Sequence, residues 1–368
     1  MENGISRRAR LFLILWVTAF VVFTLILGYT QVYQLQQAKA QAVKRHNARL
    51  TSSTVEAGKT SAETSPPPGA EDLVPVEVRV GIYMDRIVGL SIREARWTPD
   101  FYIWFSWTDS SIETIEDFQV IDGEIKSKNK LDEFTEGDRH YELYRVTAQI
   151  TKFFNISRFP CDDHLLTLKI EPSAYQSYQV KFVADEKGSN ISSRVKSPGY
   201  EIYRMGVVVK PHSYKTSRGD PRLPVDFKAT YSQFILGIGI ARPDWGIYIK
   251  MFQGLFAAAA IAFLTLFVKP TAPSRFQLGV GALFATVANT YIIARLLPDT
   301  GEITLATVVT GLTLGMVFLI MVQSAISLYI FDVKGQKALS ALFDKVTCIA
   351  FLVGYIAMNL AIPLAGSM

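Results

Sequence analysis

The stretch MFQGLFAAAAIAFLTLFV, residues 251–268, contains no charged side chain. An α-helix needs about 20 apolar residues to cross the ~30 Å hydrocarbon core of a bilayer, so this stretch is typical of a membrane span. Three more such stretches follow at Phe276–Leu297, Leu305–Phe331 and Val346–Leu364, and one precedes it at Leu11–Tyr29. The sequence therefore predicts a four-helix transmembrane bundle with one extra N-terminal transmembrane helix.

The first apolar stretch also has an interpretation as a cleaved signal peptide. The triplet Ala38–Lys39–Ala40 resembles a cleavage site, but it follows the apolar stretch by about ten residues. That separation is too large, and the stretch is long for a signal peptide. We therefore expect an uncleaved membrane anchor.

Basic residues orient the predicted spans, because the cytoplasmic loops of membrane proteins are enriched in Lys and Arg. Three short segments would lie on the same side of the membrane: the one before the first span, the one between the second and third spans, and the one before the last span. They carry Arg7, Arg8, Arg10, Lys269, Arg275, Lys334, Lys337 and Lys345. We expect a multi-pass protein of the cell (inner or plasma) membrane with its N-terminus in the cytoplasm. The segment 30–250 is then extracellular or periplasmic.

Apolar and polar residues alternate between the first and second spans, as they do in half-buried β-strands. Val76, Val78 and Val80 alternate with Glu77 and Arg79, and four similar runs follow before residue 240. The phase slips in the last run, which predicts a β-bulge near Ser232–Gln233. Many short strands without a helix-length apolar period indicate an all-β domain of the immunoglobulin-like sandwich type.

Several functional classes are disfavoured. The net charge of +5 is mild and the basic residues are scattered, so no nucleic-acid partner is expected. Asp162–Asp163–His164 makes a poor metal site, because adjacent strand residues point to opposite faces. No zinc spacing, phosphate loop or nucleophile motif occurs, so we expect neither an enzyme nor a metal or cofactor. Cys161 and Cys348 are expected at different depths and unpaired.

Six short motifs carry a family resemblance. They are FYIWFSWTD at 101–109, RFPCDDHL at 158–165, IARP at 240–243, APSR at 272–275, LP at 297–298 and FDK at 343–345. In this order and spacing the chain resembles the pentameric ligand-gated ion channels over residues 74–364. The prokaryotic members are the better match, because no cysteine pair brackets RFPCDDHL and the segment before the last helix is short. The N-terminal span is not a standard part of that family.

The resemblance implies a homopentamer that conducts inorganic ions. Together with the composition it predicts five regions. They are a cytoplasmic N-terminus at 1–10, a membrane helix at 11–29, a helical extension and flexible linker at 30–72, a ligand-binding β-sandwich at 73–242 and a pore domain at 243–368. The linker is rich in Ser, Thr, Ala, Glu and Pro and cannot bury a core.

One stripe of the helix predicted at 276–297 lines the axis of such a pentamer. Steps of three and four residues from Gln277 define it. The stripe comprises Gln277, Gly281, Phe284, Ala288, Tyr291 and Arg295. Phe284 is the candidate gate, because a ring of phenylalanines can block ions by dewetting. The competing interpretation is that Phe284 packs against lipid or another helix, and for Thr286 and Asn289 we expect hydrogen bonds between helices.

Ion selectivity depends on rings of charge. No acidic residue lies between Lys269 and Arg295, and Pro273–Ser274–Arg275 is similar to the cytoplasmic mouth of the family's anion channels. These residues favour anions. A cation-selective channel remains the alternative, because Arg275 pointing away from the axis, or Arg295 pairing with a nearby acid, would remove the argument.

The resemblance also implies a gating interface between the two domains. Its predicted residues are Asp109, Phe159, Pro160, Asp162, Arg242, Leu297, Pro298 and Asp299. The loop at 159–162 is expected to press on the turn at 297–299. Arg242 is expected to pair with Asp162 or, alternatively, with Asp109.

The ligand, a small molecule or an ion, is expected between adjacent β-domains under the hairpin at 214–224. Candidate residues are Tyr141, Tyr144, Tyr175, Tyr178, Tyr214 and Arg218. An aromatic cage for an amine is not evident, and the tyrosines have a competing interpretation as cover for the core. A non-conducting, membrane-anchored ligand sensor of the same architecture is the alternative function.

Overall fold

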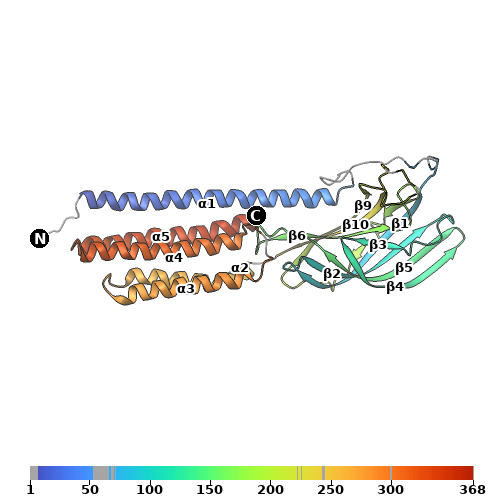
Figure 1. Ribbon diagram of the computed structural model, residues 1–368. Coiled ribbons are helices and arrows are strands. Elements are labelled where there is room, and N and C mark those ends of the chain that lie inside the picture. The colour runs from blue at the N-terminus through green and yellow to red at the C-terminus, as the bar shows by residue number, and fades with distance from the viewer. Residues whose placement is uncertain are drawn as a thin grey trace. The chain divides into compact units, whose positions relative to one another are not determined.

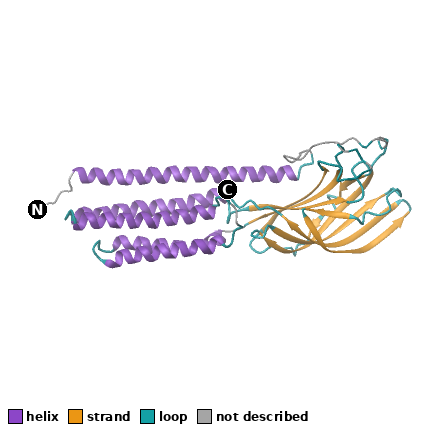
Figure 2. Ribbon diagram, in the orientation of Figure 1, coloured by secondary structure: helices purple, strands orange, loops and turns teal. Residues whose placement is uncertain are grey.

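The computed structural model describes residues 7–52, 66–67, 70, 72–221, 223–224, 226–242, 245–298 and 301–367. Within these residues the chain forms five α-helices, one short 3₁₀ helix and ten β-strands (Figures 1 and 2). Contacts divide it into two compact units. The helical unit comprises Met1–Gln41, Asn155–Asp162 and Asp244–Met368, and the β unit comprises Ala42–Phe154 and Asp163–Pro243.

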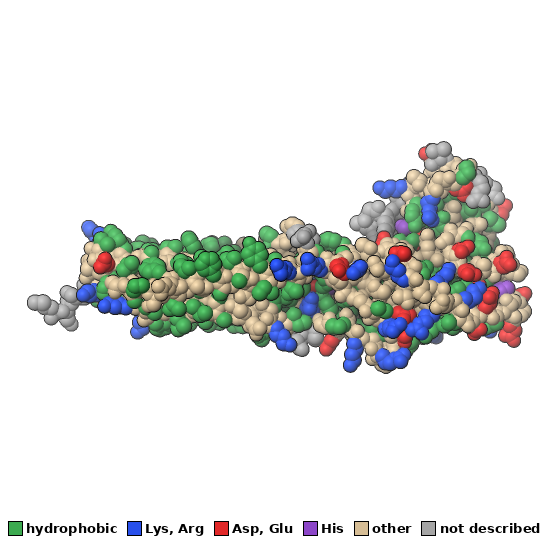
Figure 3. All heavy atoms as spheres, turned by 60° about the horizontal axis from the view of Figure 1, so that its bottom comes forward, with side chains coloured by type: hydrophobic (Ala, Val, Ile, Leu, Met, Phe, Trp, Pro, Cys, Tyr) green, Lys and Arg blue, Asp and Glu red, His purple; other side chains and the backbone are tan. Residues whose placement is uncertain are grey.

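Five helices of the described chain are long and apolar enough to cross a membrane, which indicates a membrane protein. They are α1 (Arg7–Arg49), α2 (Trp245–Leu264, followed by a 3₁₀ turn at Thr265–Phe267), α3 (Pro273–Ala294), α4 (Leu305–Asp332) and α5 (Lys337–Ser367). On the face shown in Figure 3, hydrophobic side chains cover the helical unit between its ends. The predicted number of such helices is confirmed.

The helix α1 is much longer than its apolar stretch. Its 43 residues extend about 65 Å at 1.5 Å per residue, roughly twice the hydrocarbon core. The polar part beyond Tyr29 is rich in Gln, Ala, Lys and Arg, which are good helix formers. The linker predicted up to residue 72 falls largely outside the described residues.

Local sequence explains how the helices α3 and α4 begin. Pro273 is the first helical residue of α3, where its missing N–H costs nothing. Thr304 caps α4, because its hydroxyl accepts the backbone N–H of Thr307 while the Thr307 hydroxyl accepts the backbone N–H of Thr304. The helices then pack through a buried core that includes Phe263, Ala282 and Phe351.

The β unit contains two sheets. Its strands are β1 (Val76–Ser91), β2 (Arg96–Trp107), β3 (Phe118–Ile121), β4 (Gly123–Glu136), β5 (Arg139–Thr151), β6 (Asp163–Pro172), β7 (Val180–Ala184), β8 (Asn190–Ile191), β9 (Glu201–Ser213) and β10 (Thr230–Ala241). One sheet has the order β4-β5-β2-β1-β7, with β8 also paired to β1, and the other has the order β3-β6-β10-β9. Pairing is antiparallel except where β7 and β8 join β1.

Side chains of the two sheets meet in a shared core. The rings of Phe105 on β2 and Phe118 on β3 lie 5.2 Å apart. The backbone N–H of Phe182 on β7 donates to the Ser232 hydroxyl on β10 at 2.8 Å. Val78 and Val80 on β1 are fully buried, as the alternation predicts.

The β-bulge predicted at Ser232–Gln233 is wrong. Ser232 and Gln233 continue the regular β9–β10 pairing, and the register shift lies between Gly239 and Ile240. The phase slip has a different cause, since both polar side chains are buried and hydrogen-bonded inside the β unit. The alternation pattern assumes that polar residues of a strand are exposed. When a polar residue is buried and hydrogen-bonded instead, the pattern wrongly indicates that the strand has turned its other face to the core.

The last turn of α1 packs on β9 and β10 within the β unit. Arg204 donates to the Asn47 side chain at 2.6 Å, and the Lys210 ammonium donates to the carbonyl of Ala48 at 2.7 Å. Leu50 then lies over Gly237, where a Cβ would approach its side chain to 2.6 Å. A glycine is therefore required at Gly237 for this packing.

Candidate functional site

The predicted pore stripe is the exposed face of α3. Each of its six residues is exposed in the single chain, and Phe284 and Tyr291 each keep 70% of their accessible surface. The opposite face is buried against the neighbouring helices. Its buried residues are Arg275, Gly279, Ala282, Thr286 and Ile293. The helix therefore presents to its surroundings a face that carries Gln277 and Arg295 as well as apolar residues.

Thr286 and Asn289 were expected to form hydrogen bonds between helices, and this prediction is wrong, because both side chains donate within α3. The Thr286 hydroxyl donates to the carbonyl of Ala282 at 2.8 Å, and the Asn289 amide donates to the carbonyl of Ala285 at 3.0 Å. A Cβ at Gly254 on α2 would approach the Asn289 oxygen to 2.3 Å, so that glycine allows the close packing of α2 on α3.

Arg275 does not lie on the exposed stripe. It is 1% exposed, and its two terminal nitrogens bind the two carboxylate oxygens of Asp344 on α5, each at 2.8 Å. The Gln323 amide on α4 donates to the same carboxylate at 2.6 Å and accepts from Arg275 at 3.4 Å. The Arg275 charge is thus compensated inside the helical unit, and this correction removes half of the argument for anion selectivity.

The fork-to-fork geometry explains why both charges tolerate burial. Arg275 matches a carboxylate with two parallel hydrogen bonds, the strongest pairing available to the side chain. Its third contact, to the carbonyl of Val268 at 3.1 Å, satisfies a backbone group that follows the 3₁₀ turn. The network therefore connects the beginnings of α3 and α5 with the later part of α4.

The loop at 155–162 belongs to the helical unit, although the sequence placed it in the β-domain. The carbonyls of Ser157 and Phe159 accept the backbone N–H groups of Leu305 and Ala306 at 2.9 and 3.0 Å. These donors begin α4, where helical N–H groups lack partners within the helix. Arg158 donates to the carbonyl of Gly366, near the end of α5, at 3.2 Å. Short-range pattern did not reveal this, because the partners lie far along the chain.

Seven of the eight predicted gating residues lie within the described residues. Phe159, Pro160 and Asp162 are buried, Leu297 is buried and Pro298 is half-buried, while Asp299 lies outside the described residues.

Within the β unit, Arg242 stacks 4.4 Å from the ring of Tyr200. Asp109 is exposed and accepts the backbone N–H of Ser111 at 2.8 Å instead of pairing with Arg242. This hydrogen bond holds the pKa of Asp109 below its usual value.

A buried polar cluster lies in the β unit beside the β9–β10 hairpin. The Glu171 side chain on β6 is fully buried, and its carboxylate accepts from the Gln233 amide at 2.6 Å and from the Tyr214 hydroxyl at 3.0 Å. His212 on β9 contacts the same carboxylate through Nδ1. Burial, and then the nearby Glu171 carboxylate, raise the pKa of Tyr214. We call Glu171, His212, Tyr214 and Gln233 the Glu171 cluster.

Arg218 joins the Glu171 cluster from the hairpin loop. Its guanidinium lies 4.9 Å from the ring of Tyr214 and 5.4 Å from that of Tyr231, the arrangement of a cation–π contact. Tyr214 and Arg218, two of the predicted ligand residues, are therefore brought together. Glu171 was missed, because Leu166, Leu168 and Ile170 alternate with Thr167, Lys169 and Glu171, and such a pattern places the polar residues in solvent.

Two of the remaining predicted ligand residues, Tyr141 and Tyr144, have other surroundings. Tyr144 is 1% exposed and donates to the buried Glu142 carboxylate at 2.9 Å, so it is a core residue and the competing interpretation holds for it. Tyr141 stacks on Phe134 with ring centroids 5.0 Å apart and lines a separate pocket of about 500 Å³. Tyr175 and Tyr178 are half-buried between β6 and β7.

Replacing Glu171 with Ala should destabilise the β unit. The buried Gln233 amide and the half-buried His212 and Tyr214 side chains would lose their shared acceptor, and a lost hydrogen bond to a charged group costs about 1.5–3 kcal/mol. Thermal unfolding of the purified chain measures the change, with exposed Glu186→Ala on the same unit as the matched control. Equal unfolding temperatures for the two variants would show that the Glu171 cluster contributes no stability.

Among the described residues, no group of three or more His, Cys, Asp or Glu side chains is placed to hold a metal ion. No family model matches the sequence, and no curated protein matches it either. The family assignment consequently stays a proposal that rests on the motifs, the exposed face of α3 and the clusters described above.

Proposed function

We propose that this chain is one subunit of a homopentameric ligand-gated ion channel, built from a β-sandwich and a four-helix pore domain with α1 as an additional membrane helix. The observation that carries the proposal is the exposed face of α3. This helix is the least hydrophobic of the five candidate spans, and the polar residues Gln277 and Arg295 lie on its exposed face. Polar side chains in a membrane face protein or water, and a ring of subunits around an axis supplies both.

The proposed gate is the ring of Phe284 side chains halfway along the stripe. Tyr291 lies two turns further on the same face and forms a second narrow level. With Arg275 neutralised by Asp344, only the Arg295 ring favours anions. Anion selectivity therefore rests on one residue, and a cation-selective channel is the alternative within the same proposal.

The proposed ligand site lies at interfaces between β-domains, beside the Glu171 cluster. Arg218 offers a cation on the hairpin there, which suits an acidic small molecule or an anion. The loop at 155–162 is proposed to pass the signal on, because it is hydrogen-bonded to the first residues of α4. Binding that changes the hairpin would then bias two states of the helical unit.

Recording from the purified chain in planar bilayers with asymmetric chloride tests this function. Candidate anionic and neutral ligands are applied over a range of pH. Currents that reverse near the chloride potential support an anion channel, and currents that reverse near the cation potential support the cation-selective alternative. Silence from confirmed pentamers under every condition would overturn the channel and favour the non-conducting sensor.

A further inference from the structure

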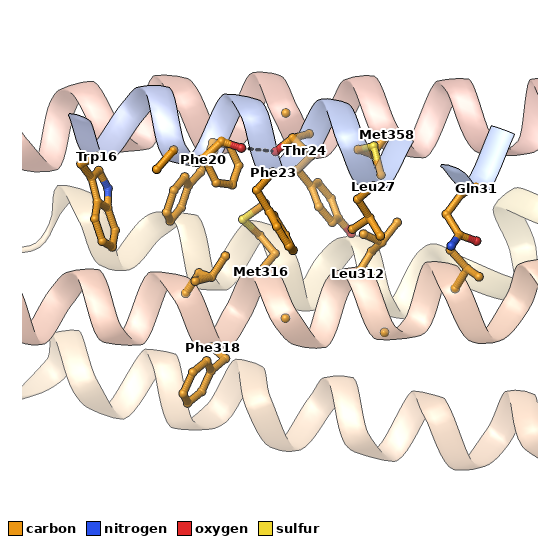
Figure 4. A pocket seen from close by; sticks show the side chains of 18 of the residues that line it. Trp16, Phe20, Phe23, Thr24, Leu27, Gln31, Leu312, Met316, Phe318 and Met358 are labelled. Carbon is orange, nitrogen blue, oxygen red and sulfur yellow. Dashed lines mark hydrogen bonds between the residues drawn. The ribbon is translucent and has the colours of Figure 1, made fainter. Parts of the chain in front are cut away.

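The additional helix α1 forms one wall of a groove within the helical unit (Figure 4). Phe20 and Leu27 line it from α1, Gly311 and Gly315 from α4, and Met358 from α5. Its volume is about 660 Å³, within the range of about 300–1,000 Å³ that is typical of ligand pockets. The proposed channel function does not use this groove.

The groove exists because α1 packs closely on α5 and leaves a gap beside α4. A Cβ on Gly354 of α5 would approach Phe20 to 2.9 Å, and one on Gly28 would approach the Met358 sulfur to 2.9 Å. By contrast, a Cβ on Gly311 or Gly315 of α4 would meet nothing within 4 Å. The two α4 glycines therefore form an open floor between tightly packed walls.

The lining is mostly apolar, with the Trp16 indole at one end, the Gln31 amide at the other, and hydroxyls between them that are already hydrogen-bonded. The Thr24 hydroxyl donates to the carbonyl of Phe20 at 2.8 Å, which Figure 4 shows as a dashed line. The Tyr355 hydroxyl is paired with Thr313 at 3.0 Å, and the Thr307 hydroxyl donates to the carbonyl of Thr304 at 2.7 Å. An apolar occupant is consequently required over most of the groove.

The groove is long and open along its side. It extends from Trp16 to Gln31, fifteen residues of α1 or about 22 Å, whereas half of the hydrocarbon core is about 15 Å. Phe23 and Phe318 line it and remain 57% and 60% exposed. In a membrane such an opening faces hydrocarbon chains, and because the groove is longer than one leaflet is deep, a single chain occupies the part nearer Gln31.

Cationic groups lie beyond the Gln31 end. Lys39 follows Gln31 by eight residues, about 12 Å along α1. Its ammonium donates to the carbonyl of Ser367 at 2.6 Å, which uses one of its three hydrogens. Arg158 donates to the neighbouring carbonyl of Gly366 but is itself buried, so Lys39 is the cation that a headgroup can reach. An anionic headgroup complements this positive end.

We propose that the groove holds one acyl chain of an anionic membrane phospholipid, with the phosphate of the lipid bound at Lys39. The occupant is a lipid rather than a second copy of the chain, because the groove is apolar within the span and positive just beyond it. The helix α1 then serves as a lipid-binding element that the remaining four helices do not provide.

Native mass spectrometry of the full chain tests the proposal. The chain is equilibrated with equal amounts of phosphatidylglycerol and phosphatidylcholine that carry identical acyl chains. We expect one phosphatidylglycerol retained per subunit. Gly315→Leu should fill the groove and lower retention at least about fivefold, while Ala325→Leu, at an exposed position of α4 outside the groove, should not. Equal retention by both variants would overturn the site.

The headgroup contact has its own test. Lys39→Gln should reduce the preference for phosphatidylglycerol over phosphatidylcholine about fivefold. This factor corresponds to the attraction of about 1 kcal/mol between one lysine and an anionic membrane surface. Lys44→Gln, an exposed lysine further along α1, should leave the preference unchanged. The same preference in both variants would contradict the placement of the phosphate.

Photolabelling keeps the proposal testable if Gly315→Leu fails to fold. A phosphatidylglycerol with a photoreactive group in its acyl chain should label the peptides that contain Phe20 and Leu312 in the unmodified chain. Labelling spread evenly over all exposed helix faces would show annular lipid only. Crosslinks between subunits without retained lipid would show a second copy in the groove. Both results would overturn the proposal without bearing on conduction.

Discussion

Replacing Arg275 with Met should lower the unfolding free energy of the helical unit by about 3–5 kcal/mol, the usual cost of breaking one side of a buried ion pair. The variant leaves the Asp344 carboxylate buried with the Gln323 amide as a remaining donor. Thermal unfolding in detergent measures the loss. Arg295→Gln is the matched control, because Arg295 follows the same helix and is exposed.

The double variant Arg275→Met/Asp344→Leu separates charge from packing. Replacing both members of a buried pair with apolar residues is often neutral, so most of the lost stability should return. A double variant as unstable as the single one would show that the shape of Arg275, rather than the uncompensated charge of Asp344, accounts for the loss. An unchanged single variant would contradict the importance of the network altogether.

The substitution Phe284→Ala should raise the current without ligand at least about tenfold, which corresponds to a shift of about 1.4 kcal/mol in the closed-to-open equilibrium. Five large apolar side chains would be removed from the narrowest level of the proposed pore, so that water could wet it. Single-channel open probability in bilayers measures the effect. Phe267→Ala is the control, because Phe267 is also exposed and lies outside the stripe.

An unaltered open probability in Phe284→Ala would contradict the gate and leave the lipid-facing interpretation of this residue. An equal increase in Phe267→Ala would show that loss of any exposed phenylalanine favours the open state. These outcomes differ from loss of folding, because a misfolded variant yields no pentamers for recording.

Local pattern predicted the repeating parts of the molecule. Five apolar stretches correspond to five long helices, and the alternation of Val78 and Val80 with polar neighbours corresponds to a strand with one buried side. Both signals depend on neighbours within a few residues, which a sequence displays directly. The stripe from Gln277 to Arg295 has the same local origin, and the structure exposes it.

The polar contacts could not be predicted in the same way. Arg275 finds Asp344 across 69 positions of sequence, and Gln233 finds Glu171 across 62. From sequence alone, a charged or polar residue with a distant buried partner is interpreted as a surface or pore residue, because the partner is not apparent. This is why Arg275 suggested an anion-selective mouth and why Glu171 was expected in solvent.

The position of the loop at 155–162 has a similar explanation. Its motif suggested contact with the turn at 297–299, and its carbonyls accept from Leu305 and Ala306, which follow that turn in the chain. The free N–H groups at the start of any helix attract acceptors, but the sequence does not show which loop supplies them. The length of α1 was easier to predict, because helix-forming residues continue beyond its apolar part.

Cysteine modification along α3 tests most directly whether its exposed face lines a pore. Ala288→Cys on the stripe and Ala282→Cys on the buried face are placed in a chain with Phe284→Ala in which Cys161 and Cys348 are replaced by Ser. We expect a charged, water-soluble thiol reagent to alter the current through Ala288→Cys channels and to leave Ala282→Cys channels unchanged. An unaffected current in Ala288→Cys, with modification confirmed by mass, would contradict a pore-lining role for this face.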